Sequence, residues 1–207
     1  MYKSFVSGIL IALIFLQACA GFQKKPAMTY AEISEKINHA GLKPSPYLLV
    51  VNTENQRLLV YKHGVLKENF VISTGKNGIG QTLGSFKTPL GLHRINDKIG
   101  EGVPPYGIFN RRQYVGVTWT KVPRYLHKKD YISTRILRLE GLELGLNRGK
   151  NAKGQVVDSE IRAIYIHGTT MEWKLGKPFT KGCVHMSTKD VMRLHDEIPL
   201  GTLVMFI

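Results

Sequence analysis

The sequence from residue 47 onward is divided into short runs of β-branched, aliphatic and aromatic residues, and the turns between them are rich in glycine. No internal repeat and no regular strand–helix alternation accompanies these runs. This pattern predicts a mainly β fold of the sandwich type. The runs that we interpret as strands are 47–52, 57–62, 65–73, 86–95, 114–120, 163–166 and 202–207.

Two short helices are expected beside the strands. Thr29 and Glu32 have the spacing of a capping box, which predicts a helix over residues 30–39. A second helix is expected at 190–196, after a serine or threonine cap. Residues 121–150 show no regular period, and we interpret them as a loop-rich insertion.

The chemically most informative stretch runs from Ala163 to Met186. Its apolar start suits a strand that ends at His167, and Cys183 follows sixteen positions later. A thiol needs a base to become a nucleophile, and imidazole suits that role near neutral pH. Gly182 allows a tight turn in which backbone N–H groups converge on a developing oxyanion. Cys183 and His167 are therefore candidates for a catalytic pair.

The pattern His-Gly-Thr, a gap, and Gly-Cys-Val-x-Met resembles the signature of the L,D-transpeptidases with a YkuD-type domain. That family usually has Ser-His-Gly-Cys-(Ile/Val)-Arg-Met, whereas here Lys181 stands at the histidine position and His185 at the arginine position. The resemblance covers roughly residues 46–207. It also includes the segments 56–61, 73–76, 134–139 and 147–149.

The resemblance implies a YkuD-like β-sandwich of mixed sheets with a few short helices. It implies that Cys183 is the nucleophile and His167 the general base, and that the carbonyl of Gly168 orients the imidazole. Backbone N–H groups near Lys181, Gly182 and Cys183 would form the oxyanion hole. No cofactor and no metal are expected.

The substrates implied by the resemblance are peptidoglycan stem peptides that contain diaminopimelate. A thioester at Cys183 would pass to a second stem or a lipoprotein, which cross-links the wall or attaches that lipoprotein to it. Two alternatives remain open: an L,D-carboxypeptidase or amidase that hydrolyses the same bonds, and an inactive wall-binding relative.

The residues around the cysteine also give expectations for substrate binding. We expect the Lys181 cation to lower the thiol pKa and Thr169 to contact substrate. His185 would bind a stem carboxylate when protonated, so affinity would fall as pH rises.

The N-terminus is similar to a bacterial lipoprotein signal. An apolar run over 5–15 is too short to span a bilayer comfortably, and Leu16-Gln-Ala-Cys19 resembles a lipobox. We therefore expect a signal peptide over 1–18, lipidation of Cys19, a linker with a short helix over 19–45 and a catalytic domain over 46–207. The protein would be exported to the periplasm, as an outer-membrane lipoprotein. Ordinary signal-peptidase cleavage near Ala18 or Ala20 is the alternative.

The composition limits the kinds of partner that the protein is expected to bind. A hydrophobic content of 43% supports an ordinary core and excludes a disordered chain. The net charge of +14 favours an acidic partner such as peptidoglycan, and the basic-aromatic patterns of nucleic-acid-binding modules are absent from the sequence. The expected partners are thus the wall and, through the Cys19 lipid, a membrane.

Two other motifs suggest different chemistry. Ser73-Thr-Gly-Lys76 matches the Ser-x-x-Lys of penicillin-binding enzymes, but that motif requires a helix and the glycine-rich surroundings oppose one. A zinc site built from His167, Cys183, His185 and His195 lacks the usual paired spacing, and His195 is expected on a helix surface. Four further histidines are interpreted as surface or loop residues: His39, His63, His93 and His127.

Overall fold

The computed structural model describes residues 28–43 and 45–207. The expected signal peptide and Cys19 lie outside the described residues. Within the described part, no helix is long and apolar enough to cross a membrane.

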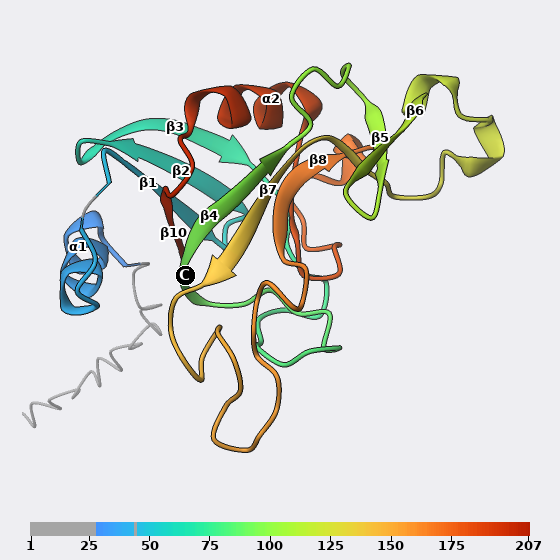
Figure 1. Ribbon diagram of the computed structural model, residues 1–207. Coiled ribbons are helices and arrows are strands. Elements are labelled where there is room, and N and C mark those ends of the chain that lie inside the picture. The colour runs from blue at the N-terminus through green and yellow to red at the C-terminus, as the bar shows by residue number, and fades with distance from the viewer. Residues whose placement is uncertain (1–27, 44) are drawn as a thin grey trace, which may run out of the picture.

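In residues 28–43 and 45–207, ten strands form one mixed sheet, accompanied by two α-helices and three short 3-10 turns (Figure 1). Along the sheet the order is β3-β2-β1-β10-β4-β7-β5-β6, and β8 pairs with β7 and β9. The pairs β1–β10 and β8–β9 are parallel, and the other pairs are antiparallel. The expectation of a mainly β, mixed-sheet fold with short helices is confirmed. The elements are α1 Tyr30–His39, β1 Tyr47–Asn52, β2 Arg57–Lys62, β3 Val65–Val71, β4 Gly91–Ile99, β5 Gly107–Asn110, β6 Gln113–Thr118, β7 Ile132–Gly141, β8 Tyr165–Thr169, β9 Val184–Met186, α2 Thr188–Glu197 and β10 Leu203–Phe206.

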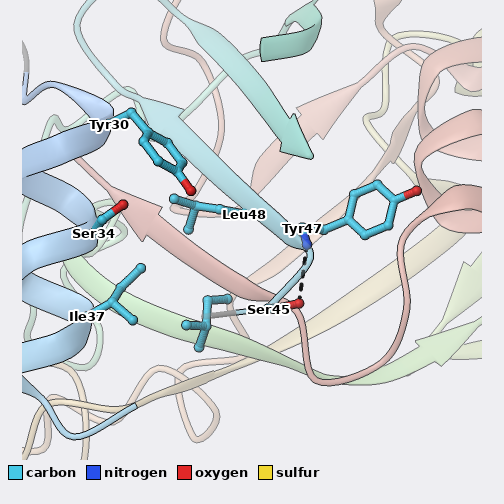
Figure 2. Close-up of a pocket in the computed structure, with 7 residues that line it drawn as sticks. Tyr30, Ser34, Ile37, Ser45, Tyr47 and Leu48 are labelled. Atoms are coloured by element: carbon cyan, nitrogen blue, oxygen red, sulfur yellow. Dashed lines mark hydrogen bonds between the residues drawn. The ribbon is translucent and has the colours of Figure 1, made fainter. Parts of the chain in front are cut away.

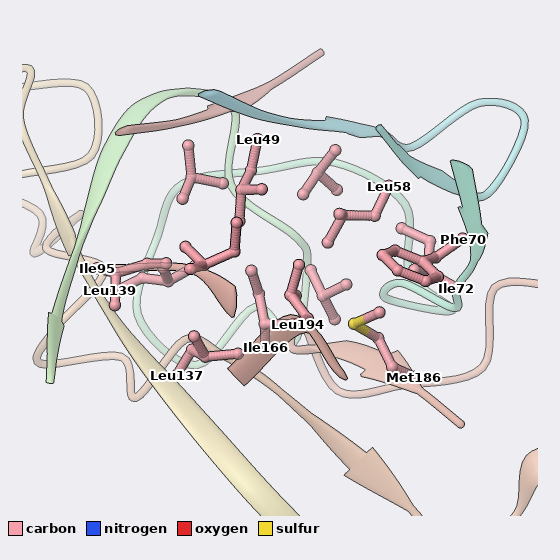
Figure 3. Packing of buried hydrophobic residues seen from close by; sticks show 14 of the residues in the cluster. Leu49, Leu58, Phe70, Ile72, Ile95, Leu137, Leu139, Ile166, Met186 and Leu194 are labelled. Atoms are coloured by element: carbon pink, nitrogen blue, oxygen red, sulfur yellow. The ribbon is translucent and has the colours of Figure 1, made fainter. Parts of the chain in front are cut away.

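The main core lies between the two halves of this sheet. Leu49 and Leu58 from β1 and β2 face Ile166 and Met186 from β8 and β9, with Leu194 of α2 among them (Figure 3). All five side chains are at most 1% exposed, and burial of each contributes roughly 1.5–3 kcal/mol to folding. The strands that carry the candidate site are therefore held by the centre of the fold.

Helix α1 covers the opposite face of the sheet. Its expected capping box is present, since Thr29 Oγ1 accepts from Glu32 N–H and the Glu32 carboxylate accepts from Thr29 N–H. Ile33 and Ile37 are buried against Leu48 and its neighbours, and a cavity of about 20 Å³ remains between helix and strand (Figure 2). The helix expected within the linker thus packs against the domain.

Three expectations are wrong. Residues 132–141 are a long central strand, β7, whereas we expected a loop-rich insertion over 121–150. His93 and His195 were placed on the surface, but they are 0% and 4% exposed. His93 is packed on β4, where its Nε2 lies 2.8 Å from the hydroxyl of Ser159. The strand expected at 86–95 is also shifted: the observed strand, β4, spans 91–99.

Candidate functional site

Two parallel strands, β8 and β9, bring the candidate residues together. In their register, His167 lies opposite His185, and the two ring centroids are 4.3 Å apart. Cys183 directly precedes β9 and has the same parity as His185, so it belongs to the same face of the strand. The sixteen-residue separation in sequence is thereby closed by strand pairing.

His167 is held in the form that a general base requires. Its side chain is 2% exposed, and its Nδ1 lies 2.9 Å from the carbonyl oxygen of Gly168. Because a carbonyl oxygen only accepts, Nδ1 carries the proton and Nε2 keeps the basic lone pair. Burial lowers the pKa of His167, with opposing contributions from the Gly168 carbonyl and Asp130. The imidazole is thus neutral at pH 7.

The Cys183 thiol is half-buried and un-ionised. It donates to the carbonyl oxygen of Ala163, with Sγ 3.3 Å from that oxygen. Burial raises its pKa to about 11, against smaller lowering contributions from the Tyr165 backbone and the Arg162 cation. The expected lowering of this pKa by Lys181 is wrong, and activation requires a base to remove the proton during attack.

The turn before Cys183 is fixed by close backbone contacts. Gly182 has φ +115°, and a Cβ there would lie 2.9 Å from the carbonyl oxygen of Lys87, so only glycine fits without strain. The Thr180 hydroxyl accepts from the Gly182 N–H at 3.1 Å and donates to the Cys183 carbonyl at 2.7 Å. The N–H of Gly182 is therefore already engaged, and its contribution to an oxyanion hole would require exchange of that bond.

Cys183, His167 and His185 line one cleft of about 480 Å³. Residues 128–132, which end at the first residue of β7, are among the residues that line it. Among the described residues, one carboxylate lines the cleft, that of Asp130, together with four lysines: Lys128, Lys129, Lys174 and Lys181. A surplus of cations suits a substrate with carboxylates.

Asp130 is bound to Thr169 of β8 and lies near His185 of β9, and the sequence gives no indication of it. Its Oδ1 accepts from the Thr169 hydroxyl at 2.6 Å, and its Oδ2 lies 3.5 Å from His185 Nδ1, too far and too poorly aligned for a hydrogen bond. Thr169 is fully buried, so its hydroxyl holds the Asp130 carboxylate at the cleft and does not make the substrate contact that we had expected. The position of Asp130 after two lysines, in a stretch without period, gave no signal of this role.

His185 is not the cation that the sequence suggested. It is 5% exposed, and burial together with the neighbouring His167 holds its pKa well below 6.5. Phe179 meets its ring edge-on, with centroids 5.2 Å apart. The expected protonation-dependent binding of a carboxylate is therefore wrong for pH values near neutrality.

The cation that lowers the pKa of Cys183 is Arg162 and not Lys181. The Lys181 ammonium lies 5.9 Å from the centre of the Phe86 ring, and its side chain is exposed. Arg162, one residue before Ala163, is the cation that acts on the Cys183 pKa. Arg162 was missed because a single arginine before a strand has no distinguishing pattern.

The other motifs do not have the geometry that their suggested chemistry requires. Ser73 follows β3 in extended backbone and pairs through N–H and C=O with His185, so it is not on a helix. His195 lies on α2, beside a separate pocket with Lys98 and Asp196. Across 28–43 and 45–207, no group of three or more His, Cys, Asp or Glu side chains is arranged to hold a metal ion.

Comparison with known proteins assigns the family. The sequence model of the L,D-transpeptidase catalytic domain (YkuD) matches residues 46–205. The chain belongs to this family. Curated proteins gave no match.

Solved L,D-transpeptidases resemble the chain at low identity. The enzyme from Mycobacterium smegmatis is 15% identical with a TM-score of 0.45, over 78% of this chain and 58% of that one. The L,D-transpeptidase from Xylanimonas cellulosilytica is 16% identical with a TM-score of 0.48, over 84% and 69%. L,D-transpeptidase 3 from Mycobacterium tuberculosis is 16% identical with a TM-score of 0.47, over 78% and 61%. The chain thus spans about three fifths of the length of the two mycobacterial structures.

Proposed function

We propose that this L,D-transpeptidase family member transfers acyl groups between peptidoglycan stem peptides through a thioester at Cys183. The observation that carries the proposal is the placement of Cys183 and His167 in one cleft, with the His167 Nδ1 proton committed to the Gly168 carbonyl. This leaves Nε2 as the base for the thiol. Cross-linking of stems and attachment of a lipoprotein are both outcomes of such a transfer.

In the proposed reaction the thiol and the imidazole are both neutral before attack. His167 takes the proton from Cys183 as Sγ attacks the carbonyl carbon at the L-centre of diaminopimelate. N–H groups of Lys181 and Cys183, with Gly182 after release from Thr180, stabilise the oxyanion. The C–N bond then breaks, and the leaving amine receives the proton from His167. An acceptor amine resolves the thioester by the same steps in reverse.

Incubation with labelled diaminopimelate-containing muropeptides tests this proposal. We expect a dimeric product with the wild type, and losses of at least about a hundredfold in Cys183→Ala and His167→Ala. A shortened monomer as the main product would instead identify an L,D-carboxypeptidase or amidase. Binding to sacculi without turnover would identify an inactive wall-binding relative and contradict the proposal.

We further propose that residues 1–18 direct export and that Cys19 carries a lipid, so that residues 46–207 work in the periplasm from an outer-membrane anchor. The support is the sequence pattern Leu16-Gln-Ala-Cys19 after a short apolar run. Metabolic labelling with an alkyne fatty acid should mark the wild type and not Cys19→Ala. Equal labelling of the two would refute lipidation at this residue.

A further inference from the structure

A second pocket of about 180 Å³ lies beside the nucleophile. It is lined by Leu83, Gly84, Phe86, Arg162, Ile164 and Lys181. Lys181 also lines the main cleft, so the two spaces adjoin at this residue. Arg162 directly precedes Ala163, whose carbonyl oxygen is 3.3 Å from Cys183 Sγ. We call this space the Arg162 pocket. Two of its lining residues are close in sequence to the reacting sulfur: Arg162 precedes Ala163, and Lys181 is two positions before Cys183.

The Arg162 guanidinium is only partly satisfied. Its Nη2 donates to the carbonyl oxygen of Lys87 at 2.5 Å, while its buried Nη1 has no hydrogen-bond partner among the described residues. Arg94 and Arg138, by contrast, each face a carboxylate at 2.9 Å. None of the six residues lining the Arg162 pocket is acidic. A half-buried cation with an unpartnered N–H is costly unless an anion pairs with it.

The remaining walls are apolar and held in place. Phe86 is 53% exposed and has φ +56°, an unfavourable backbone for a bulky residue, and its ring lies under the Lys181 ammonium. The Thr88 hydroxyl donates to the Gly182 carbonyl at 3.0 Å, which ties this loop to the turn before Cys183. The pocket therefore combines two cations with small apolar surfaces from Leu83 and Ile164.

We propose that the Arg162 pocket binds the terminal carboxylate of the residue that leaves when Cys183 attacks. This inference deepens the proposed function and rests on it. In a peptide, that carboxylate is separated from the scissile carbonyl carbon only by the amide nitrogen and one Cα. When the C–S bond forms and the C–N bond breaks, the small amino acid departs with the proton from His167 and with its carboxylate unchanged. Bidentate donation by Arg162 would thus select chains that end one residue after the scissile bond.

Thiol alkylation tests the anion site without any turnover. Iodoacetate carries a carboxylate and iodoacetamide does not, and both react with the thiolate, so the ratio of their rates cancels changes in thiol pKa. We expect this ratio to fall about five- to tenfold in Arg162→Gln and by a smaller factor in Lys181→Gln, because each removes attraction for the anionic reagent. Arg162→Lys should keep most of the ratio, and Arg148→Gln, which removes an exposed cation in the 142–150 loop, should not change it.

Substrate comparison then separates this inference from the proposed function. Wild-type protein should prefer a tetrapeptide stem with a free carboxyl terminus over its C-terminal amide by about 10- to 100-fold in kcat/KM, and Arg162→Gln should lose that preference. Equal alkylation ratios in wild type, Arg162→Gln and Lys181→Gln would overturn the anion site, whatever the activity. A changed ratio in a protein without transferase activity would sustain the anion site and refute the function on which its physiological role depends. Lys181 is exposed, so its variant remains informative if Arg162→Gln does not fold.

Discussion

The ionisation state of Cys183 gives the sharpest quantitative prediction. A pKa of about 11, against an ordinary value of 9.0, leaves the thiol protonated throughout the physiological range. At pH 8 about one molecule in a thousand carries the thiolate, compared with about one in ten for an ordinary thiol. The intrinsic reactivity of a thiolate rises with its pKa, by about six- to tenfold for this difference. The net expectation is alkylation by iodoacetamide about tenfold slower than that of a free exposed cysteine.

The assay is the pseudo-first-order rate of Cys183 alkylation by iodoacetamide between pH 6 and 10.5, followed by intact mass. The rate should rise about tenfold per pH unit up to pH 10. The same profile is expected for His167→Ala, because burial, the Tyr165 backbone, Arg162 and Asp130 set this pKa. A rate that levels off near pH 7 would refute the reasoning, since it would show a preformed thiolate–imidazolium pair.

Three further predictions follow from named contacts. Burial lowers the pKa of His93 from 6.5 to about 4, so the unfolded state binds the proton more readily, and the free energy of unfolding should fall by up to about 3 kcal/mol as pH drops from 6.5 to 4. Urea titrations should show this fall in the wild type and a smaller one in His93→Gln, and an equal fall in both proteins would contradict the prediction. Because the pKa of His185 lies well below 6.5, we expect the pH dependence of the KM for stem peptides between pH 5.5 and 8 to be the same in the wild type and in His185→Ala. A change of KM with pH that is present in the wild type and lost in His185→Ala would show that His185 binds substrate as a titrating cation. In Gly168→Ala the new Cβ would lie 2.6 Å from the Ser133 carbonyl oxygen, so the free energy of unfolding in urea should be about 1–3 kcal/mol lower than in the wild type. An unchanged urea midpoint would contradict this, because it would show that β7 and β8 can move apart without cost.

The parts of the fold that were predictable carry local signals. Both helices were expected because capping residues mark their starts: Thr29 with Glu32 at α1, and Ser187, whose hydroxyl accepts from Asp190 N–H, at α2. The strands β1 and β2 were expected because their apolar runs end in turn residues.

Strand β7 was missed for a physical reason. It pairs with β4 and β5 on one side and with β8 on the other, and most of its residues are buried on both faces. A strand covered on both faces shows no alternation of apolar and polar residues. Register shifts against β4 and β8 and a positive φ at Thr134 interrupt its pattern further. Its arginines, Arg135 and Arg138, reach the Val103 carbonyl and Asp97 through the tertiary structure.

The sequence singles out the candidate reactive residues and not their surroundings. His167 and Cys183 carry a spacing and neighbours that can be compared with a family, whereas Asp130 and Arg162 lie in stretches without pattern. Their roles depend on distances between separate segments: Asp130 reaches Thr169 from the loop before β7, and Arg162 reaches Lys87. The same dependence explains why the expected effect of Lys181 on the thiol was wrong, since its side chain turns toward Phe86.

The central claim is that Cys183 is a nucleophile served by His167, and intact mass after treatment with a carbapenem tests it most directly. The strained amide of that reagent acylates an activated thiol and leaves a stable mass increase. We predict one adduct on the wild type, none on Cys183→Ala, and formation at least about a hundredfold slower on His167→Ala. Equal labelling of wild type and Cys183→Ala would contradict the assignment.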